Sequence, residues 1–134
     1  MKELKKYQEK AIVQLLTLSK MYFDLEGNET IVLQAPTGSG KTFTMARYML
    51  ELVQDSDLDL CFLWVSIGRG ELHKQSLKSV KREVDDTLSC TLLEQEFFGS
   101  RSEINQNEVV FVNWEKIRNK DKDTGEFKNT VMKD

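Results

Sequence analysis

Apolar residues recur at helical spacing over three stretches of the chain. The first stretch covers residues 3–23, and its apolar positions are Leu4, Tyr7, Ala11, Leu15 and Leu18. Its spacing predicts an amphipathic helix that ends near "DLEGNE", where Gly27 supplies a turn. The second stretch has apolar positions at Phe43, Ala46, Met49 or Leu50, and Val53. The third stretch covers about residues 70–85, and all three patterns predict helices with one buried face.

Short apolar runs separate these helices and predict β-strands. The clearest runs are "TIVLQ" at about residues 30–35, "LCFLWVS" at 60–66 and "VVFVNW" at 109–114, and a weaker one is "LSCTLLE" at 88–94. Strands that alternate with helices form parallel β-α units in which helices cover the sheet. We therefore expect an α/β fold with a parallel sheet flanked by helices.

Composition indicates one ordinary globular domain. A chain of 134 residues, of which 40% are apolar and 31% charged, is long enough for one hydrophobic core and too short for two. No apolar stretch approaches the roughly 20 residues that cross a bilayer, and the Lys-rich start lacks a signal-type apolar core. Cys61 and Cys90 are isolated, which indicates buried thiols in a reducing compartment. We expect a cytoplasmic protein with no membrane partner.

The end of the chain differs from the rest. Residues 119–134 are polar and show no periodicity. We therefore expect a folded region at residues 1–118, followed by a polar tail or an unfinished loop.

The sequence "APTGSGKT", residues 35–42, lies between the first strand and the second helix. Gly38 and Gly40 lack a Cβ atom, so the backbone can adopt positive φ and turn successive N–H groups toward one anion. The following helix adds unpaired N–H groups and the positive end of its dipole. A strand, this loop and a helix in this order predict a phosphate-binding loop. The alternative is a glycine-rich turn without a ligand.

The residue types in this loop suit a nucleoside triphosphate with Mg²⁺. The expected contacts come from Thr37, Gly38, Ser39, Gly40, Lys41 and Thr42. Lys41 would reach the β- and γ-phosphates, and the Thr42 hydroxyl would help to hold the metal ion. ATP and Mg²⁺ are therefore the expected cofactors. The usual motif begins with glycine, whereas this chain has Ala35.

Gln8 lies on the first predicted helix, which must pack beside the loop. A glutamine amide offers the donor and acceptor that match N7 and the N6 amino group of adenine, and Tyr7 can offer a ring face. Without the loop, Gln8 would be a surface residue and Tyr7 a core residue. With the loop, we expect Gln8 to read adenine.

Two further strand ends carry polar residues. The first, in "WVSIGRGELHKQS", supplies Ser66, Gly68, Arg69 and Gly70, and the second, in "VVFVNWEKI", supplies Asn113 and Trp114. Ligands of parallel sheets gather at the carboxyl ends of the strands. Backbone N–H groups and an arginine suit a nucleic-acid phosphate. The alternative for Trp114 is simple packing.

The charge distribution is uneven. The net charge of −3 argues against a uniformly basic surface, yet residues 69–83 carry a local charge of +3. Its basic members are Arg69, Lys74, Lys78, Lys81 and Arg82. A solvated helix face would look the same, so this stretch alone does not indicate a nucleic-acid site.

In this order and at these spacings, "YQ", "APTGSGKT", "WVSIGRGELHKQS" and "VVFVNWEKI" resemble the start of the first motor domain of superfamily-2 helicases. They look most like the Res subunit of type III restriction enzymes and its DEAD/DEAH-like relatives. The resemblance covers residues 3–118 and implies a partial RecA-like ATP-binding domain at residues 1–118. It also implies that Gln8 reads adenine, that residues 37–42 hold the triphosphate and Mg²⁺, and that the polar strand ends line a nucleic-acid path.

The chain departs from this family at its other end. Such motors carry an acidic DExx motif, whose Asp binds Mg²⁺ through water and whose Glu activates the attacking water. Neither "DTGE" nor "VMKD" follows an apolar strand, so neither is a substitute. The second motor domain with its arginine finger and the nuclease domain are also absent. We therefore expect a fragment of the motor with no identifiable catalytic residue.

The resulting hypothesis is an ATP-binding N-terminal fragment of a DNA-dependent translocase of restriction type. Its implied partners are DNA, bound weakly, and a modification subunit of the parent enzyme. One alternative is a non-catalytic remnant that binds a nucleotide or a partner. Another is a small P-loop phosphotransferase, which needs several arginines in a lid, whereas residues 99–134 offer only Arg101 and Arg118.

Overall fold

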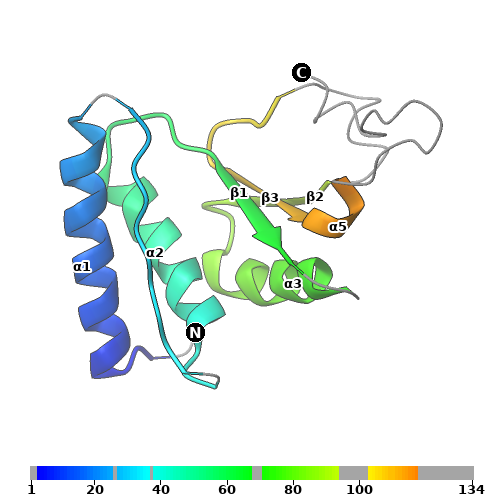
Figure 1. Cartoon of the computed structure of the whole chain (residues 1–134), viewed down its shortest axis with the longest axis horizontal. Coiled ribbons are helices and arrows are strands. Elements are labelled where there is room, and N and C mark those ends of the chain that lie inside the picture. Colours follow the sequence, from blue (N-terminus) through cyan, green and yellow to red (C-terminus); the bar gives the residue numbers. More distant parts are fainter. Residues whose placement is uncertain (1–2, 26, 37, 68–70, 94–102, 118–134) are drawn as a thin grey trace.

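The structure is a computed structural model that describes residues 3–25, 27–36, 38–67, 71–93 and 103–117. Along the chain, the elements are α1 (Lys6–Phe23), α2 (Lys41–Asp55), β1 (Phe62–Ser66), α3 (Leu72–Val84), β2 (Ser89–Leu92), β3 (Glu108–Asn113) and α5 (Trp114–Ile117). Figure 1 shows their arrangement. The three long helices and all three of these strands lie where the apolar pattern predicts them.

The three strands form one parallel sheet in the order β1-β3-β2. In its register Phe62 lies opposite Val109, and Ser66 lies opposite Asn113. All six residues of β3 are buried. A central parallel strand is covered on both faces, which explains its continuous apolar run. The expected α/β fold with a parallel sheet is confirmed.

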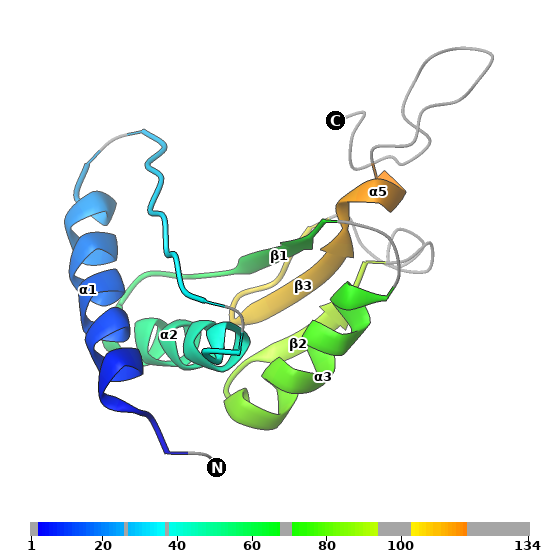
Figure 2. The same cartoon turned by 60° about the horizontal axis from the view of Figure 1, so that its bottom comes forward.

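The hydrophobic core lies where α2 and α3 pack against the sheet (Figures 1 and 2). Its buried members are Ala46, Met49 and Leu50 from α2, Val80 and Val84 from α3, Leu88, and Val109 and Phe111 from β3. Trp64 of β1 extends this core, with its ring centroid 5.5 Å from that of Phe111. α1 packs against α2 on the side away from the sheet (Figure 2).

The segment from residue 27 to residue 36 contradicts the strand expected at about residues 30–35. It connects α1 to the loop before α2 and belongs to no described strand. Val32, in the middle of the apolar run, is 76% exposed. A β-strand requires hydrogen bonds to a neighbouring strand, and none of the described strands pairs with this segment. The prediction of a buried strand is therefore wrong for the chain as described.

The buried face of α1 is rotated from the expected one. The structure buries Gln8, Ile12, Leu15 and Ser19, whereas Tyr7 is 50% exposed. A surface position for Gln8 and a core position for Tyr7, the alternatives without a ligand at the loop, are therefore both wrong. The physical reason is that α1 packs partly against polar backbone, which accepts an amide more readily than an apolar face would.

Both cysteines are free, but Cys61 is exposed because it directly precedes an edge strand. The expectation of two buried thiols is therefore wrong for Cys61. Burial raises the pKa of the Cys90 thiol, and the nearby charge of Lys81 acts in the opposite direction. The tail expected at residues 119–134 lies outside the described residues, so the domain boundary remains a prediction.

Among the described residues, no helix combines the length and the apolar character that crossing a membrane requires.

Candidate functional site

The loop before α2 has the backbone geometry that its glycines predict. Gly38 and Gly40 have φ angles of 84° and 78°, in the left-handed region. The Ser39 N–H donates to the Pro36 carbonyl at 3.1 Å, which closes the turn. The backbone N–H and the side-chain hydroxyl of Thr44 both donate to the Gly40 carbonyl at 2.9 Å. The loop therefore turns tightly and leads directly into a helix, while Thr37 lies outside the described residues.

The start of α2 is open to an anion. Its N-cap is Gly40, so no side chain caps the helix and its first N–H groups lack intrahelical acceptors. The Lys41 side chain is exposed, and Thr42 is half-buried at the second helical position. The Ser39 Oγ atom is buried without a hydrogen-bond partner in the described chain. These donors fit a phosphate group, which would satisfy the helix start and the buried hydroxyl together.

Two neighbouring residues of α1 hold this loop from the side. The Tyr7 hydroxyl donates to the Ser39 carbonyl at 2.8 Å, and the Gln8 Nε2 atom donates to the same carbonyl at 3.2 Å. The Gln8 Oε1 atom accepts a hydrogen bond from the Lys5 N–H at 2.9 Å, as in one half of a capping box. One loop carbonyl is thus fixed by two side chains that are more than 30 residues away along the chain.

The apolar and polar pattern of the sequence does not predict that the Tyr7 hydroxyl anchors the loop, because it places the Tyr7 ring against a base or in the core. The adjacency of Tyr7 and Gln8 is the sequence signal for this site. A sequence does not reveal whether a tyrosine contributes its ring or its hydroxyl, because this depends on the packing angle of the helix.

Gly40 has a second reason to be glycine. A Cβ atom at this position would lie 2.7 Å from the Gln8 Nε2 atom, closer than real side chains allow. Its φ of 78° would also strain any other residue. The observed position of the Gln8 amide against the loop therefore depends on the missing Cβ atom.

A cavity of about 190 Å³ lies beside the loop, and α1 forms its other wall. Its lining residues are Glu3, Lys5, Tyr7, Gln8, Gly38, Ser39, Gly40 and Phe43. The Gln8 amide has two N–H groups and two lone pairs, of which the contacts to Ser39 and Lys5 use one each. One donor and one acceptor remain for a ligand, so Gln8 can hold the loop and contact a base simultaneously.

The polar ends of β1 and β3 lie side by side as the sequence predicts, but their side chains differ in exposure to solvent. Ser66 and Asn113 are paired in the register of β1 and β3, so both lie at the carboxyl edge of the sheet. Asn113 is buried, and its Oδ1 atom accepts the Glu115 N–H at 2.8 Å at the start of α5. Trp114 is 38% exposed, so packing does not account for the whole ring.

The other predicted residues of this edge, Gly68, Arg69 and Gly70, lie outside the described residues. None of the described edge residues lines the cavity beside the loop. The structure thus brings Gln8 together with the loop, and it brings Ser66 together with Asn113, as two separate groups.

The basic stretch on α3 is partly neutralised. The Lys74 Nζ atom lies 2.9 Å from a carboxylate oxygen of Glu71 at the start of the helix. Lys78, Lys81 and Arg82 are exposed on the same helix. α3 therefore presents three positive charges to solvent, which fits either a solvated face or a phosphate backbone.

The sequence and the fold of this chain are similar to those of known restriction enzymes. A family model described as "Type III restriction enzyme, res subunit" matches residues 1–133. A solved structure, the nuclease-deletion mutant of the Type ISP restriction-modification enzyme LlaGI in complex with a DNA substrate mimic, has a similar fold with a TM-score of 0.62 and 20% sequence identity. The similarity covers 87% of this chain and 13% of that chain. No curated protein matches the sequence.

Proposed function

Because the chain belongs to the family of type III restriction enzyme Res subunits, we propose that it is the nucleotide-binding part of a DNA-dependent ATPase of that class. The observation that carries the proposal is the loop of residues 38–42, in which two left-handed glycines lead into an uncapped helix. The Ser39 hydroxyl, which is buried and has no hydrogen-bond partner among the described residues, supports a ligand at this loop. The proposed site of action is the cytoplasm.

Residues 37–42 are proposed to hold the triphosphate. Backbone N–H groups of the loop and of the first helical turn would surround the phosphates, and the exposed Lys41 ammonium would pair with the β- and γ-phosphate oxygens. The Thr42 hydroxyl is the proposed protein ligand of Mg²⁺, which neutralises phosphate charge when it is bound.

Gln8 is proposed to select adenine. Its buried amide lies beside the loop and has one donor and one acceptor left after its contacts to Ser39 and Lys5. Adenine presents the matching acceptor and donor at N7 and the N6 amino group, whereas guanine presents an acceptor in place of that amino group. Tyr7 would orient the loop through its hydroxyl and border the base with its ring.

DNA is proposed to pass along the carboxyl edge of the sheet. The LlaGI enzyme with a similar fold was solved with a DNA substrate mimic, and this edge carries Ser66 and the exposed Trp114. Gly68, Arg69, Gly70 and Asn113 are the other proposed contacts. The net charge of −3 opposes the approach of DNA, so binding by these 134 residues should be weak and sensitive to salt.

Hydrolysis is not expected from residues 1–134. Phosphoryl transfer to water needs a group that orients the water and a counter-charge for the transition state, in addition to the phosphate contacts. A DExx motif after an apolar strand is absent from this sequence. The proposal is therefore nucleotide binding without turnover.

The test of the loop is the Lys41→Ala variant. Removal of the ammonium should weaken ATP and ADP binding by about 1.5–3 kcal/mol, as expected for charge-assisted hydrogen bonds. Titration calorimetry measures this change, with Lys10→Ala on α1 as the matched control, because Lys10 is exposed and lines neither the loop nor its cavity. Equal affinity of the folded Lys41→Ala protein would refute the phosphate site.

Phosphate release tests the expected lack of turnover. The purified chain with ATP, Mg²⁺ and double-stranded DNA should release no more phosphate than its Lys41→Ala variant. DNA-stimulated release that is lost in the variant would show that a carboxylate outside a DExx motif completes the active site.

A further inference from the structure

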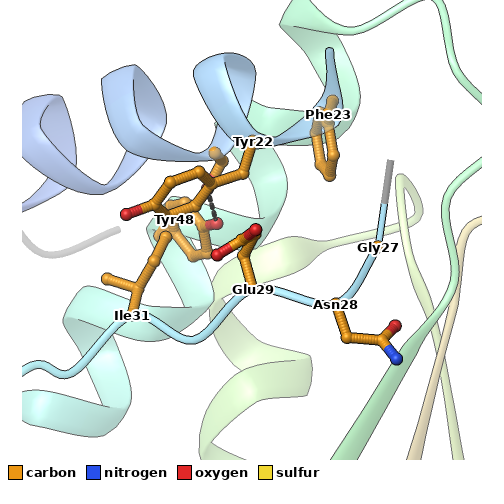
Figure 3. A pocket seen from close by; sticks show the side chains of 8 residues that line it. Tyr22, Phe23, Gly27, Asn28, Glu29, Ile31 and Tyr48 are labelled. Carbon is orange, nitrogen blue, oxygen red and sulfur yellow. Dashed lines mark hydrogen bonds between the residues drawn. The ribbon is translucent and has the colours of Figure 1, made fainter. Parts of the chain in front are cut away.

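A second cavity, of about 350 Å³, lies at the C-terminal end of α1 (Figure 3). Its walls are the last turns of α1, the middle of α2 and the segment that follows Gly27. Its lining residues are Ser19, Tyr22, Phe23, Gly27, Asn28, Glu29, Ile31 and Tyr48. None of them lines the cavity beside the phosphate loop. Tyr7 and Tyr22 lie about 22 Å apart along the axis of α1, at the helical rise of about 1.5 Å per residue.

The lining combines aromatic rings with one carboxylate. Tyr22 and Phe23 enter from α1, Tyr48 enters from α2, and Glu29 extends from the segment opposite toward the helices (Figure 3). A hydrogen bond between the Ser19 and Tyr48 hydroxyl groups fixes the Tyr48 ring against α1. The part of the lining that the structure describes contains no lysine or arginine. Aromatic faces and a carboxylate both attract positive charge.

The surroundings of the cavity are also negative. α1 ends at Phe23, so its last carbonyl groups and the negative end of its dipole lie beside the cavity. The nearest basic residue on α1, Lys20, has its Nζ atom 3.4 Å from a carboxylate oxygen of Asp55. Glu29 has no ion-pair partner among the described residues. A cation that enters the cavity would therefore meet a carboxylate that no described side chain neutralises.

We propose that this cavity binds a guanidinium group carried on a short alkyl stem. A planar guanidinium can stack on an aromatic ring and donate two parallel hydrogen bonds to one carboxylate, which an ammonium group cannot do. The apolar stem would pack against Ile31 and the Phe23 ring. A divalent metal ion fits poorly, because Glu29 is the single carboxylate among the described residues of the lining.

The test uses agmatine, which is a guanidinium on a four-carbon amine, and N-(4-aminobutyl)urea, which keeps the stem and the amine but has an uncharged urea in place of the guanidinium. In the complete 134-residue chain, agmatine should shift the NMR signals of Phe23, Ile31 and Tyr48. It should bind about tenfold more tightly than N-(4-aminobutyl)urea, as expected for a charge-assisted contact. An acetylated Gly-Arg-Gly amide forms a second arm. Tighter binding of the peptide identifies a protein side chain as the source of the group, and tighter binding of agmatine identifies a free small molecule.

Variants of the cavity test which side chains bind the guanidinium group. Glu29→Gln keeps the size of the side chain and should reduce agmatine binding to the level of N-(4-aminobutyl)urea. Asp24→Asn, which removes a nearby carboxylate outside the lining, should change binding less than about twofold. Phe23→Leu keeps an apolar wall without a ring and should weaken binding about twofold to fivefold. Lys41→Ala should leave agmatine binding unchanged, so the outcome is independent of the nucleotide proposal.

Two results would overturn the proposal. One is equal affinity for agmatine and N-(4-aminobutyl)urea. The other is unchanged agmatine binding in a Glu29→Gln protein whose circular dichroism spectrum matches that of the parent. If Glu29→Gln does not fold, Phe23→Leu decides the question, and unchanged binding in that variant counts against the site.

Discussion

Tyr7 and Gln8 both donate to the Ser39 carbonyl, yet they should affect nucleotide binding differently. Among the described residues, the hydrogen bond of the Tyr7 hydroxyl goes to the loop backbone, so its influence on a ligand should act through the shape of the loop. Gln8 lines the cavity beside the loop and keeps one donor and one acceptor after its contacts to Ser39 and Lys5. The first residue should therefore act on every nucleotide, and the second should act on adenine nucleotides most.

Substitution of the two residues separates these roles. Tyr7→Phe removes one neutral hydrogen bond and should weaken ATP and GTP equally, by about 0.5–1.5 kcal/mol. Gln8→Ala should weaken ATP more than GTP and so reduce the preference for adenine. Calorimetric titrations of both nucleotides into each variant measure these changes, with Tyr22→Phe at the other end of α1 as the hydroxyl-removal control.

A change of base preference in Tyr7→Phe would contradict a role through the loop alone. Equal affinity of the parent chain for ATP and GTP would mean that Gln8 only anchors the loop.

Among the elements, β3 organises the sheet because both other described strands pair with it. Its first residue, Glu108, is a buried carboxylate rather than an apolar side chain. One of its oxygens accepts the Thr91 hydroxyl at 2.6 Å, and the other accepts the Asn105 N–H at 2.9 Å. These contacts join β2, the preceding turn and β3 at the edge opposite to Asn113. Glu108 is thus a structural residue of the sheet, remote from the proposed ligands.

Glu108→Gln should lower the free energy of unfolding by about 1–3 kcal/mol, because the amide nitrogen cannot accept one of these two hydrogen bonds. Urea denaturation followed by circular dichroism measures the change. Glu103→Gln is the matched control, since Glu103 is exposed in the same connection. Equal stability of the two variants would mean that water or another donor replaces the lost contact.

Across the whole molecule, the apolar surface near β1 stands out. β1 is an edge strand, and Leu63 and Val65 on it are 54% and 41% exposed. Ile67, directly after β1, is also exposed. An exposed strand edge with apolar neighbours promotes association between chains.

The chain should therefore associate with itself as its concentration rises. Leu63→Lys places a charge on the strand edge and should shift the chain toward the monomer, because a like charge would face its copy. Sedimentation velocity over a concentration series measures this shift, and Val13→Lys, on an exposed position of α1, is the control. A parent chain that stays monomeric throughout would show that this surface does not drive association.

Several features of this protein follow from the sequence alone because they depend on neighbours along the chain. Gly38 and Gly40 permit the left-handed turn, the apolar period after Thr42 defines α2, and the continuous run in β3 requires burial on both faces. These properties arise from backbone sterics and from local periodicity. The sequence therefore determined the tight turn before α2, the helix after it and the parallel sheet.

Other features were decided only by contacts between distant segments. Gln8 is buried and Tyr7 exposed because α1 meets the loop backbone, which no periodicity of apolar residues records. The run "TIVLQ" has the composition of a strand but no described partner, and a strand exists only where a second chain segment accepts its hydrogen bonds. Asn113 begins α5 as a cap because its side chain reaches the Glu115 N–H in the folded chain. Hydrogen bonds between residues far apart in the sequence depend on their positions in space, which a pattern along the chain does not contain. The tertiary structure alone therefore decided which partners these side chains have.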